Sequence, residues 1–149
     1  MCARLLPIVI LLAGLSGCPE KWTAEQHLWQ GVTMQKEKEL DKAVFHFTKA
    51  VELDANLEEA FRRRATINLG VALATNDKDR IAQVVSDFSR SIELRKYNPS
   101  AYYFRGEAYR MQGRMKLALA DFQASCKMRN TMGCVVARRI RDGRPAHGR

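Results

Sequence analysis

The sequence predicts an all-α fold, an array of three helix hairpins closed by one further helix at the C-terminal end. Three observations carry this prediction. A template of eleven residues, with phenylalanine at its fifth position, occurs three times along the chain. A pair of glycines repeats the same register. Helix-start signals precede the segments that the repeat marks as helical.

The three template copies run over 43–53, 84–94 and 118–128, and their phenylalanines are 41 and 34 residues apart. Gly31 and Gly106 are separated by 75 residues, which matches the spacing from the first phenylalanine to the third. Two independent markers therefore give one register. Small residues would let the two helices of a hairpin approach closely, and the aromatic would fill the gap to the next hairpin. The predicted repeat core consists of Gly31, Ala43, Phe47, Ala50, Phe88, Gly106, Tyr109, Ala118 and Phe122.

Each template copy follows a second helical segment, and these segments span 24–37, 58–75 and 99–112. Thr23 with Gln26 predicts a capping box, and Asn98 before Pro99 predicts an N-cap followed by proline at the first helical position. The seven extra residues of the second repeat are expected around 71–80, with Asn76 or Asp77 as a cap in the turn. Residues 131–141 should form a helix that covers the last repeat.

In the spacing of Tyr102, Gly106, Tyr109, Gly113, Ala118 and Phe122, and of Gly31, Ala43, Phe47 and Ala50, the sequence resembles the tetratricopeptide-repeat (TPR) family, whose period is 34 residues. The resemblance implies a right-handed superhelix. Its repeats would span about 24–57, 58–98 and 99–130, and the capping helix 131–141 would complete a domain over 24–141.

Residues 1–17 have the layout of a secretory signal: Arg4, an apolar run over 5–15, then Ser16 and Gly17. The apolar run has 11 residues, whereas a membrane-spanning helix needs about 20. The sequence Leu15-Ser16-Gly17-Cys18 resembles the lipobox of bacterial lipoproteins. This resemblance implies that Cys18 carries a diacylglyceryl lipid and begins the mature chain, ahead of a linker over 18–23. An ordinary signal peptide with a nearby cysteine is the alternative interpretation.

These features predict an exported chain that is anchored by lipid and faces the periplasm, since two or more acyl chains hold a protein stably on a membrane. Pro19 follows the cysteine in place of the aspartate that marks inner-membrane retention, which favours the outer membrane.

An exported chain meets an oxidising environment, so Cys126 and Cys134 are candidates for a structural disulfide between the last repeat and the capping helix. The stretch 125–134 is similar to the cysteine-paired helix ends of Sel-like repeat proteins. Free thiols, or a redox or metal role, are the alternatives. His27, His46 and His147 fall on unrelated segments, and neither a metal nor a cofactor is expected.

The sequence contains no phosphate-binding glycine loop, zinc motif or nucleophile elbow, so no catalytic residues and no enzyme activity are expected. The net charge of +9 suggests acidic partners. Residues 142–149 are predicted to form a basic disordered tail. The arginines at 138, 139, 141, 144 and 149 support an alternative function, binding of anionic lipid, glycan or another polyanion. Export makes chromosomal nucleic acid an improbable partner.

The leading hypothesis is a membrane-anchored adaptor that binds another envelope protein or peptide in the groove lined by the first helices. Trp29 and Phe104 could instead belong to the core, and the run Arg62–Arg64 could be a solvated face. The carboxylate clamp of some TPR domains is not expected, because Leu28, Val32, Arg63, Ser100 and Phe104 occupy its positions. The predicted groove residues are Leu28, Trp29, Val32, Arg62, Arg63, Thr66, Tyr103, Phe104, Glu107 and Arg110.

Overall fold

The computed structural model describes residues 21–146, so the predicted signal segment, Cys18 and His147 lie outside the described residues. Within this range the chain forms seven helices and no strand. The predicted all-α fold is therefore confirmed. No helix in this part of the chain is both long and apolar enough to cross a membrane. The helices are α1 (Ala24–Lys36), α2 (Leu40–Leu53), α3 (Glu58–Thr75), α4 (Lys78–Leu94), α5 (Pro99–Met111), α6 (Met115–Lys127) and α7 (Thr131–Arg141).

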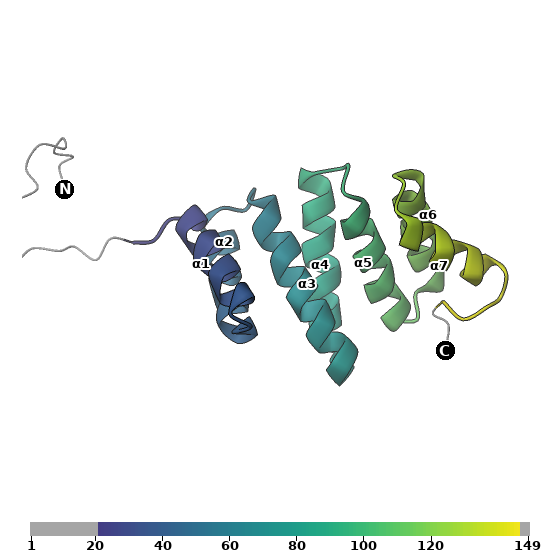
Figure 1. The fold of residues 1–149 in the computed structure, drawn as a ribbon, viewed down its shortest axis with the longest axis horizontal. Coiled ribbons are helices and arrows are strands. Elements are labelled where there is room, and N and C mark those ends of the chain that lie inside the picture. The colour runs from purple at the N-terminus through teal and green to yellow at the C-terminus, as the bar shows by residue number, and fades with distance from the viewer. Residues whose placement is uncertain (1–20, 147–149) are drawn as a thin grey trace, which may run out of the picture.

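The three hairpins follow one another along the long axis of the molecule in chain order, with α7 at the far end (Figure 1). α1 packs on α2, α3 on α4 and α5 on α6, and each hairpin also contacts the next one. The single helix α7 packs on α6, while α3 also contacts α5, so the first helices of successive hairpins are neighbours. Because each hairpin packs mainly against its neighbours, the array has two distinct ends, one at α1 and one at α7.

Local sequence signals set the helix boundaries. The Thr23 hydroxyl accepts from the Gln26 backbone amide at 3.2 Å, and the Gln26 side chain accepts from the Thr23 amide at 2.7 Å. Asn98 caps α5 through the Ala101 amide at 3.2 Å. In the second hairpin Asn76 ends α3 with a φ of 53°, and Asp77 caps α4. The insertion therefore lengthens α3 to 18 and α4 to 17 residues by adding to both helices at one turn.

The three template phenylalanines occupy equivalent, fully buried places. Phe47, Phe88 and Phe122 are each 0% exposed. A Cβ built on Gly31 would lie 2.6 Å from Cε1 of Phe47, and one built on Gly106 would lie 2.9 Å from Cε1 of Phe122. The rings therefore rest on the backbone of the preceding helix, at a distance that only glycine allows without a shift.

Each ring also belongs to a core cluster that includes the following hairpin or, for Phe122, the single helix α7. The Phe47 cluster includes Ile67 of α3, the Phe88 cluster includes Ala101 of α5, and the Phe122 cluster includes Val136 of α7. One aromatic per repeat thus joins the two helices of a hairpin and attaches that hairpin to the next. Ala43, Ala50 and Ala118 are also fully buried, whereas Tyr109 is half-buried beside Phe122.

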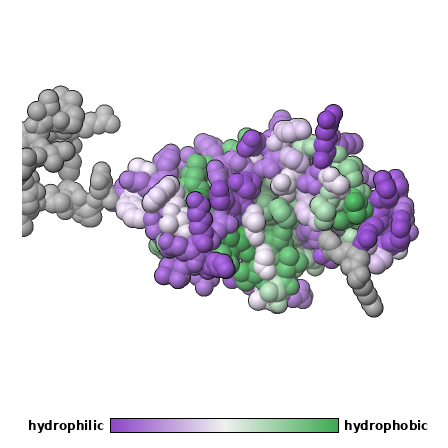
Figure 2. Space-filling model, in the orientation of Figure 1, coloured by the Kyte–Doolittle hydropathy of each residue, from purple (hydrophilic) through white to green (hydrophobic). Residues whose placement is uncertain are grey.

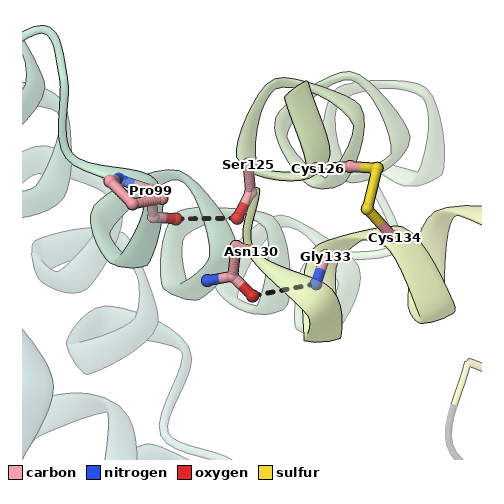
Figure 3. Close-up of a disulfide and its surroundings, with 6 residues drawn as sticks. All are labelled: Pro99, Ser125, Cys126, Asn130, Gly133 and Cys134. Carbon is pink, nitrogen blue, oxygen red and sulfur yellow. Dashed lines mark hydrogen bonds between the residues drawn. A yellow bond between two sulfur atoms is a disulfide. The ribbon is translucent and has the colours of Figure 1, made fainter. Parts of the chain in front are cut away.

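The C-terminal end is closed by α7. A disulfide joins Cys126 of α6 to Cys134 in the first turn of α7 (Figure 3). The Ser125 hydroxyl donates to the Pro99 carbonyl at 2.8 Å, and Asn130 caps α7 through the Gly133 amide at 3.1 Å. In the chain-entropy model a crosslink that closes so short a loop stabilises the folded state by roughly 2.5 kcal/mol. The crosslink therefore attaches α7, which is not part of a hairpin, to the last repeat.

The chain beyond α7 differs from the predicted disordered tail over 142–146. Gly143 adopts a φ of 69°, and the Gly143 and Arg144 amides donate to the Ile140 and Arg139 carbonyls at 3.1 and 2.8 Å. This left-handed glycine ends the helix and reverses the chain. Ala146 consequently packs against the Phe122 cluster.

We predict that Gly106→Ala lowers the free energy of unfolding by about 1 to 3 kcal/mol, because the new methyl group forces the Phe122 ring to shift. Gly70→Ala is the matched control. Gly70 is also within a helix, but a Cβ there would meet nothing within 4 Å. This variant should gain about 0.5 to 1 kcal/mol from helix propensity. Urea unfolding of both variants checks the prediction, and equal effects would contradict it.

Candidate functional site

We call the outward surface of the first helices α1, α3 and α5 the first-helix face; α3 contacts α5, and a side-chain bond joins α3 to α1. Arg63 of α3 spans two hairpins on this face. Its Nη1 donates to Oε1 of Gln35 on α1 at 3.0 Å, and its Nε donates to Glu59 at 2.7 Å. The face is thus fixed by side-chain bonds between repeats in addition to the core beneath it.

Trp29, Arg63 and Phe104 occupy equivalent positions in the three first helices. Each lies two residues before the small core residue of its repeat, which is Gly31, Ala65 or Gly106. In the later repeats this position turns toward the preceding hairpin. Phe104 stacks on Phe88 with ring centroids 5.9 Å apart, and Arg63 reaches Gln35. No hairpin precedes α1 in the described chain, and Trp29 is 69% exposed. Its exposure therefore follows from its place at the open end of the array.

A hollow of about 480 Å³ lies at this open end. Trp22, which is 46% exposed, lines it together with Trp29. The other lining residues are the polar side chains of α1 at Glu25, Gln26 and Gln30. The open end thus combines two exposed indole rings with carboxylate and amide groups, a composition suited to binding a partly apolar surface.

Several predicted groove residues support the face from below and do not line it. Leu28 and Val32 pack against the Phe47 cluster. Tyr103 packs against Phe122 with ring centroids 5.7 Å apart. Its burial raises the pKa of the phenol, and the charge of Glu107 raises it further.

Glu107 is itself buried, with 5% exposed, and accepts bonds from Arg110 at 2.9 and 3.0 Å. Burial in the helix interface therefore removes Glu107 from the predicted groove surface, whereas the half-buried Arg110 stays at its edge.

The middle of the first-helix face changes character along α3. Arg62, Arg63 and Thr66 are half-buried near its centre, and the Thr66 hydroxyl donates to the Arg62 carbonyl at 2.8 Å. Toward the end of α3, Leu73 is 56% exposed. Figure 2 shows hydrophobic surface over this lower part of α3, flanked by hydrophilic surface. The inserted residues thus extend an apolar area beyond the length of the other hairpins.

The structure shows two buried ion pairs that the sequence interpretation missed. Arg64 donates to both carboxylate oxygens of Asp87 at 2.8 Å and to the Thr48 hydroxyl at 3.2 Å. Only 11% of the Arg64 side chain and 2% of the Asp87 side chain are exposed. Arg64 is therefore not part of a solvated face.

The third repeat contains the same arrangement. Arg105 donates to both oxygens of Asp121 at 2.8 Å and to Ser89 of the preceding hairpin at 3.2 Å. The hydrogen bonds to Asp121 raise the pKa of Arg105. A usable signal was present in the sequence, since arginine precedes the small core residue and aspartate precedes the phenylalanine in both repeats.

The first repeat departs from this pattern, because Gln30 and His46 occupy the arginine and aspartate positions. His46 instead faces His27, with their Nδ1 atoms 3.0 Å apart. The expectation that the histidines would be scattered is therefore wrong for these two. Partial burial lowers the pKa of both imidazoles, with Lys49 contributing at His27 and His27 contributing at His46. Among residues 21–146 no group of three or more His, Cys, Asp or Glu side chains is placed to hold a metal ion.

Comparisons with known proteins agree with this architecture. The family model described as tetratricopeptide repeat matches residues 99–131. The first TPR of Spaghetti (RPAP3), solved bound to the HSP90 peptide SRMEEVD, superposes with a TM-score of 0.69 at 20% identity, covering 81% of this chain and 92% of that one. The Arabidopsis OM64 TPR domain gives 0.69 at 26% identity, covering 80% and 94%. MamA gives 0.68 at 19% identity, covering 80% and 68%. The chain therefore has the superhelical TPR fold.

We predict that Asp121→Ala lowers the free energy of unfolding by roughly 3 kcal/mol, because it leaves the Arg105 guanidinium buried without its counter-charge. Glu93→Ala is the control, because it removes an ion pair with Arg90 in which the Glu93 side chain is 64% exposed. Its free energy of unfolding should fall by less than about 1 kcal/mol. Denaturant unfolding of both variants measures the difference. A loss at Asp121 no larger than that of the control would show that the buried pair does not stabilise the array.

Proposed function

We propose that the chain is a lipid-anchored adaptor of the bacterial cell envelope that binds another polypeptide at the open end of its first-helix face. The observation that carries this proposal is the 69% exposure of Trp29 at a position where the third repeat stacks a half-buried Phe104 on Phe88. A large indole left in water is a site at which a partner gains binding free energy by covering it, and tryptophan and arginine are the residues most enriched in such hot spots.

The solved relatives support a polypeptide ligand. The Spaghetti domain was solved with an HSP90 peptide, and arrays of stacked hairpins offer extended surfaces of this kind. The mode of binding proposed for this chain differs from a carboxylate clamp. Leu28, Val32 and Phe104 occupy the clamp positions. Their side chains have no polar group to bind a C-terminal carboxylate, and they pack against core clusters. Arg62 and Arg63 already pair with Glu58 and Glu59. We therefore infer a partner that places an apolar side chain on Trp29.

The proposed anchor is close to this surface in sequence. Cys18 precedes Trp22 by four residues, a stretch that spans at most roughly 14 Å when fully extended. A lipid on Cys18 would thus hold the open end of the array near the membrane, with α7 directed away from it. The lipobox resemblance of residues 15–18 and the short preceding apolar run support this part of the proposal.

The basic end of the array favours a second candidate, binding of a polyanion such as an anionic glycan or lipid headgroup. Arg138 is exposed on α7 and forms no ion pair within the described residues. Arg141 and Arg144 flank Asp142, so that carboxylate neutralises part of the cluster. Binding of this kind would weaken steeply as salt rises, whereas contact through indole rings would not.

To test the adaptor function, partners captured by crosslinking the full-length chain in the native envelope would be identified, purified and titrated against variants. We expect Trp29→Ala to weaken binding by about tenfold or more, with little dependence on salt. Tyr97→Ala is the matched control, because Tyr97 is also 69% exposed but lies in the loop between α4 and α5. An equal loss of affinity in Trp29→Ala and Tyr97→Ala would reject the site. Binding that disappears at raised salt in both variants would also reject it.

To test the anchor, incorporation of labelled palmitate into the full-length chain would be measured. We expect labelling of the wild type and of Cys2→Ser, and its loss in Cys18→Ser, because only the latter removes the thiol at the lipobox position. Labelling that persists in Cys18→Ser would rule out this attachment site.

A further inference from the structure

A pair of histidines between α1 and α2 is not used by the proposed function. The Nδ1 atoms of His27 and His46 are 3.0 Å apart. The Trp22 ring lies against both imidazoles, with centroid distances of 5.1 Å to His27 and 5.5 Å to His46. These residues come from the linker and from two different helices, so the fold brings them together from separate parts of the sequence.

The first repeat lacks the buried arginine–aspartate pair of the later repeats, and His46 lies at one of the two positions that differ. His46 replaces the aspartate found at 87 and 121, and Gln30 replaces the arginine found at 64 and 105. The ion pairs in the later repeats stabilise the hairpin with opposite charges. The first repeat has instead two imidazole nitrogens that face each other, one donating a hydrogen bond and the other accepting it. Imidazole nitrogens are also the commonest protein ligands of metal ions.

We propose that His27 and His46 form a two-nitrogen binding site for a divalent transition-metal ion, Cu(II) in the first place. Imidazole nitrogen is a preferred ligand of copper, nickel and zinc, and the Irving–Williams order gives Cu(II) the highest affinity of the divalent series. The remaining coordination positions belong to water or to a ligand from outside the chain, because no third side chain among the described residues completes the set.

The separation of the two nitrogens allows both to bind one ion. With metal–nitrogen bonds of about 2.0 to 2.1 Å, two ligands at a right angle lie about 2.9 Å apart, and two ligands at the tetrahedral angle about 3.3 Å apart. The 3.0 Å between the two Nδ1 atoms is an ordinary hydrogen-bond length and lies between these two values. The preference for Cu(II) therefore rests on the affinity order.

The protons balance without a further group. The hydrogen bond between the two Nδ1 atoms requires that one imidazole carry its proton there. When a metal ion binds, that imidazole takes up the tautomer protonated at Nε2, which leaves both Nδ1 lone pairs for the metal. Each ring stays neutral, so no net proton is released.

An open hollow gives access to the site. It has a volume of about 470 Å³ and is lined by Lys21, Trp22, His27, His46, Lys49, Glu52 and Leu53. Lys49 is held by Glu52 at 2.7 Å, which reduces its repulsion of an incoming cation. With two protein ligands and an open side, the bound ion should exchange readily.

Cu(II) quenching of tryptophan fluorescence locates the ion, because the chain has two tryptophans and one of them lies against both imidazoles. In the full-length Trp29→Phe variant, Trp22 is the only tryptophan, and selective excitation of tryptophan isolates its emission from that of the tyrosines. We expect CuCl₂ to quench it with a 1:1 stoichiometry, and His46→Gln or His27→Gln in this background to raise the apparent Kd by about tenfold or more. His147→Gln is the matched control and should leave the titration unchanged.

Circular dichroism of each variant confirms that its helices remain folded, and electron paramagnetic resonance of the copper-loaded chain reports its ligands independently. Coupling to two imidazole nitrogens in the parent and to fewer in either histidine variant supports the site. Quenching that is absent in the parent, or that persists unchanged in His46→Gln, would overturn it. Persistent quenching would assign the copper to other groups, such as the thiol of Cys18.

Discussion

The array depends on the contact between one phenylalanine per hairpin and the backbone of the preceding helix. The Phe47 and Phe122 rings lie so close to Gly31 and Gly106 that a Cβ at either glycine would clash with the ring. This close approach brings the two helices together and at the same time aims the ring's far side at the next hairpin, so intra-repeat and inter-repeat packing share one side chain. In the second hairpin Ala65 is the small residue of the Phe88 cluster, so the close approach over bare backbone is seen in the first and third hairpins.

Because every hairpin covers part of the one after it, the two ends of the array have different properties. The C-terminal end is covered by α7, which the Cys126–Cys134 disulfide attaches to α6. The N-terminal end has no such cover within the described residues, and Trp29 is exposed where Phe104 is packed. The first repeat also lacks the buried ion pair of its successors and carries the histidine pair in its place. The distinctive chemistry of the chain is therefore concentrated in its first hairpin.

The helices, their caps and the buried phenylalanines could be predicted from the sequence, because period, small residues and capping side chains act locally and repeat. Features that depend on neighbours could not. Trp29 and Phe104 are equivalent in sequence, and only their positions in the array decide which is exposed. Glu107 has the helical spacing of a surface residue but is buried in the interface. Arg64 belongs to a charged run, yet a partner 23 residues away holds it inside. His27 and His46 meet because α1 and α2 pack as they do, a detail finer than the repeat register.

A double-mutant cycle on Gly106 and Phe122 tests most directly whether the ring-on-backbone contact organises the array. Gly106→Ala and Phe122→Leu would each be measured by urea unfolding, together with the double variant. If the contact is the organising constraint, the smaller leucine relieves the clash with the new methyl group. The combined loss of stability then falls short of the sum of the single losses by about 1 kcal/mol or more. Strict additivity of the two losses would contradict this account of how the hairpins are joined.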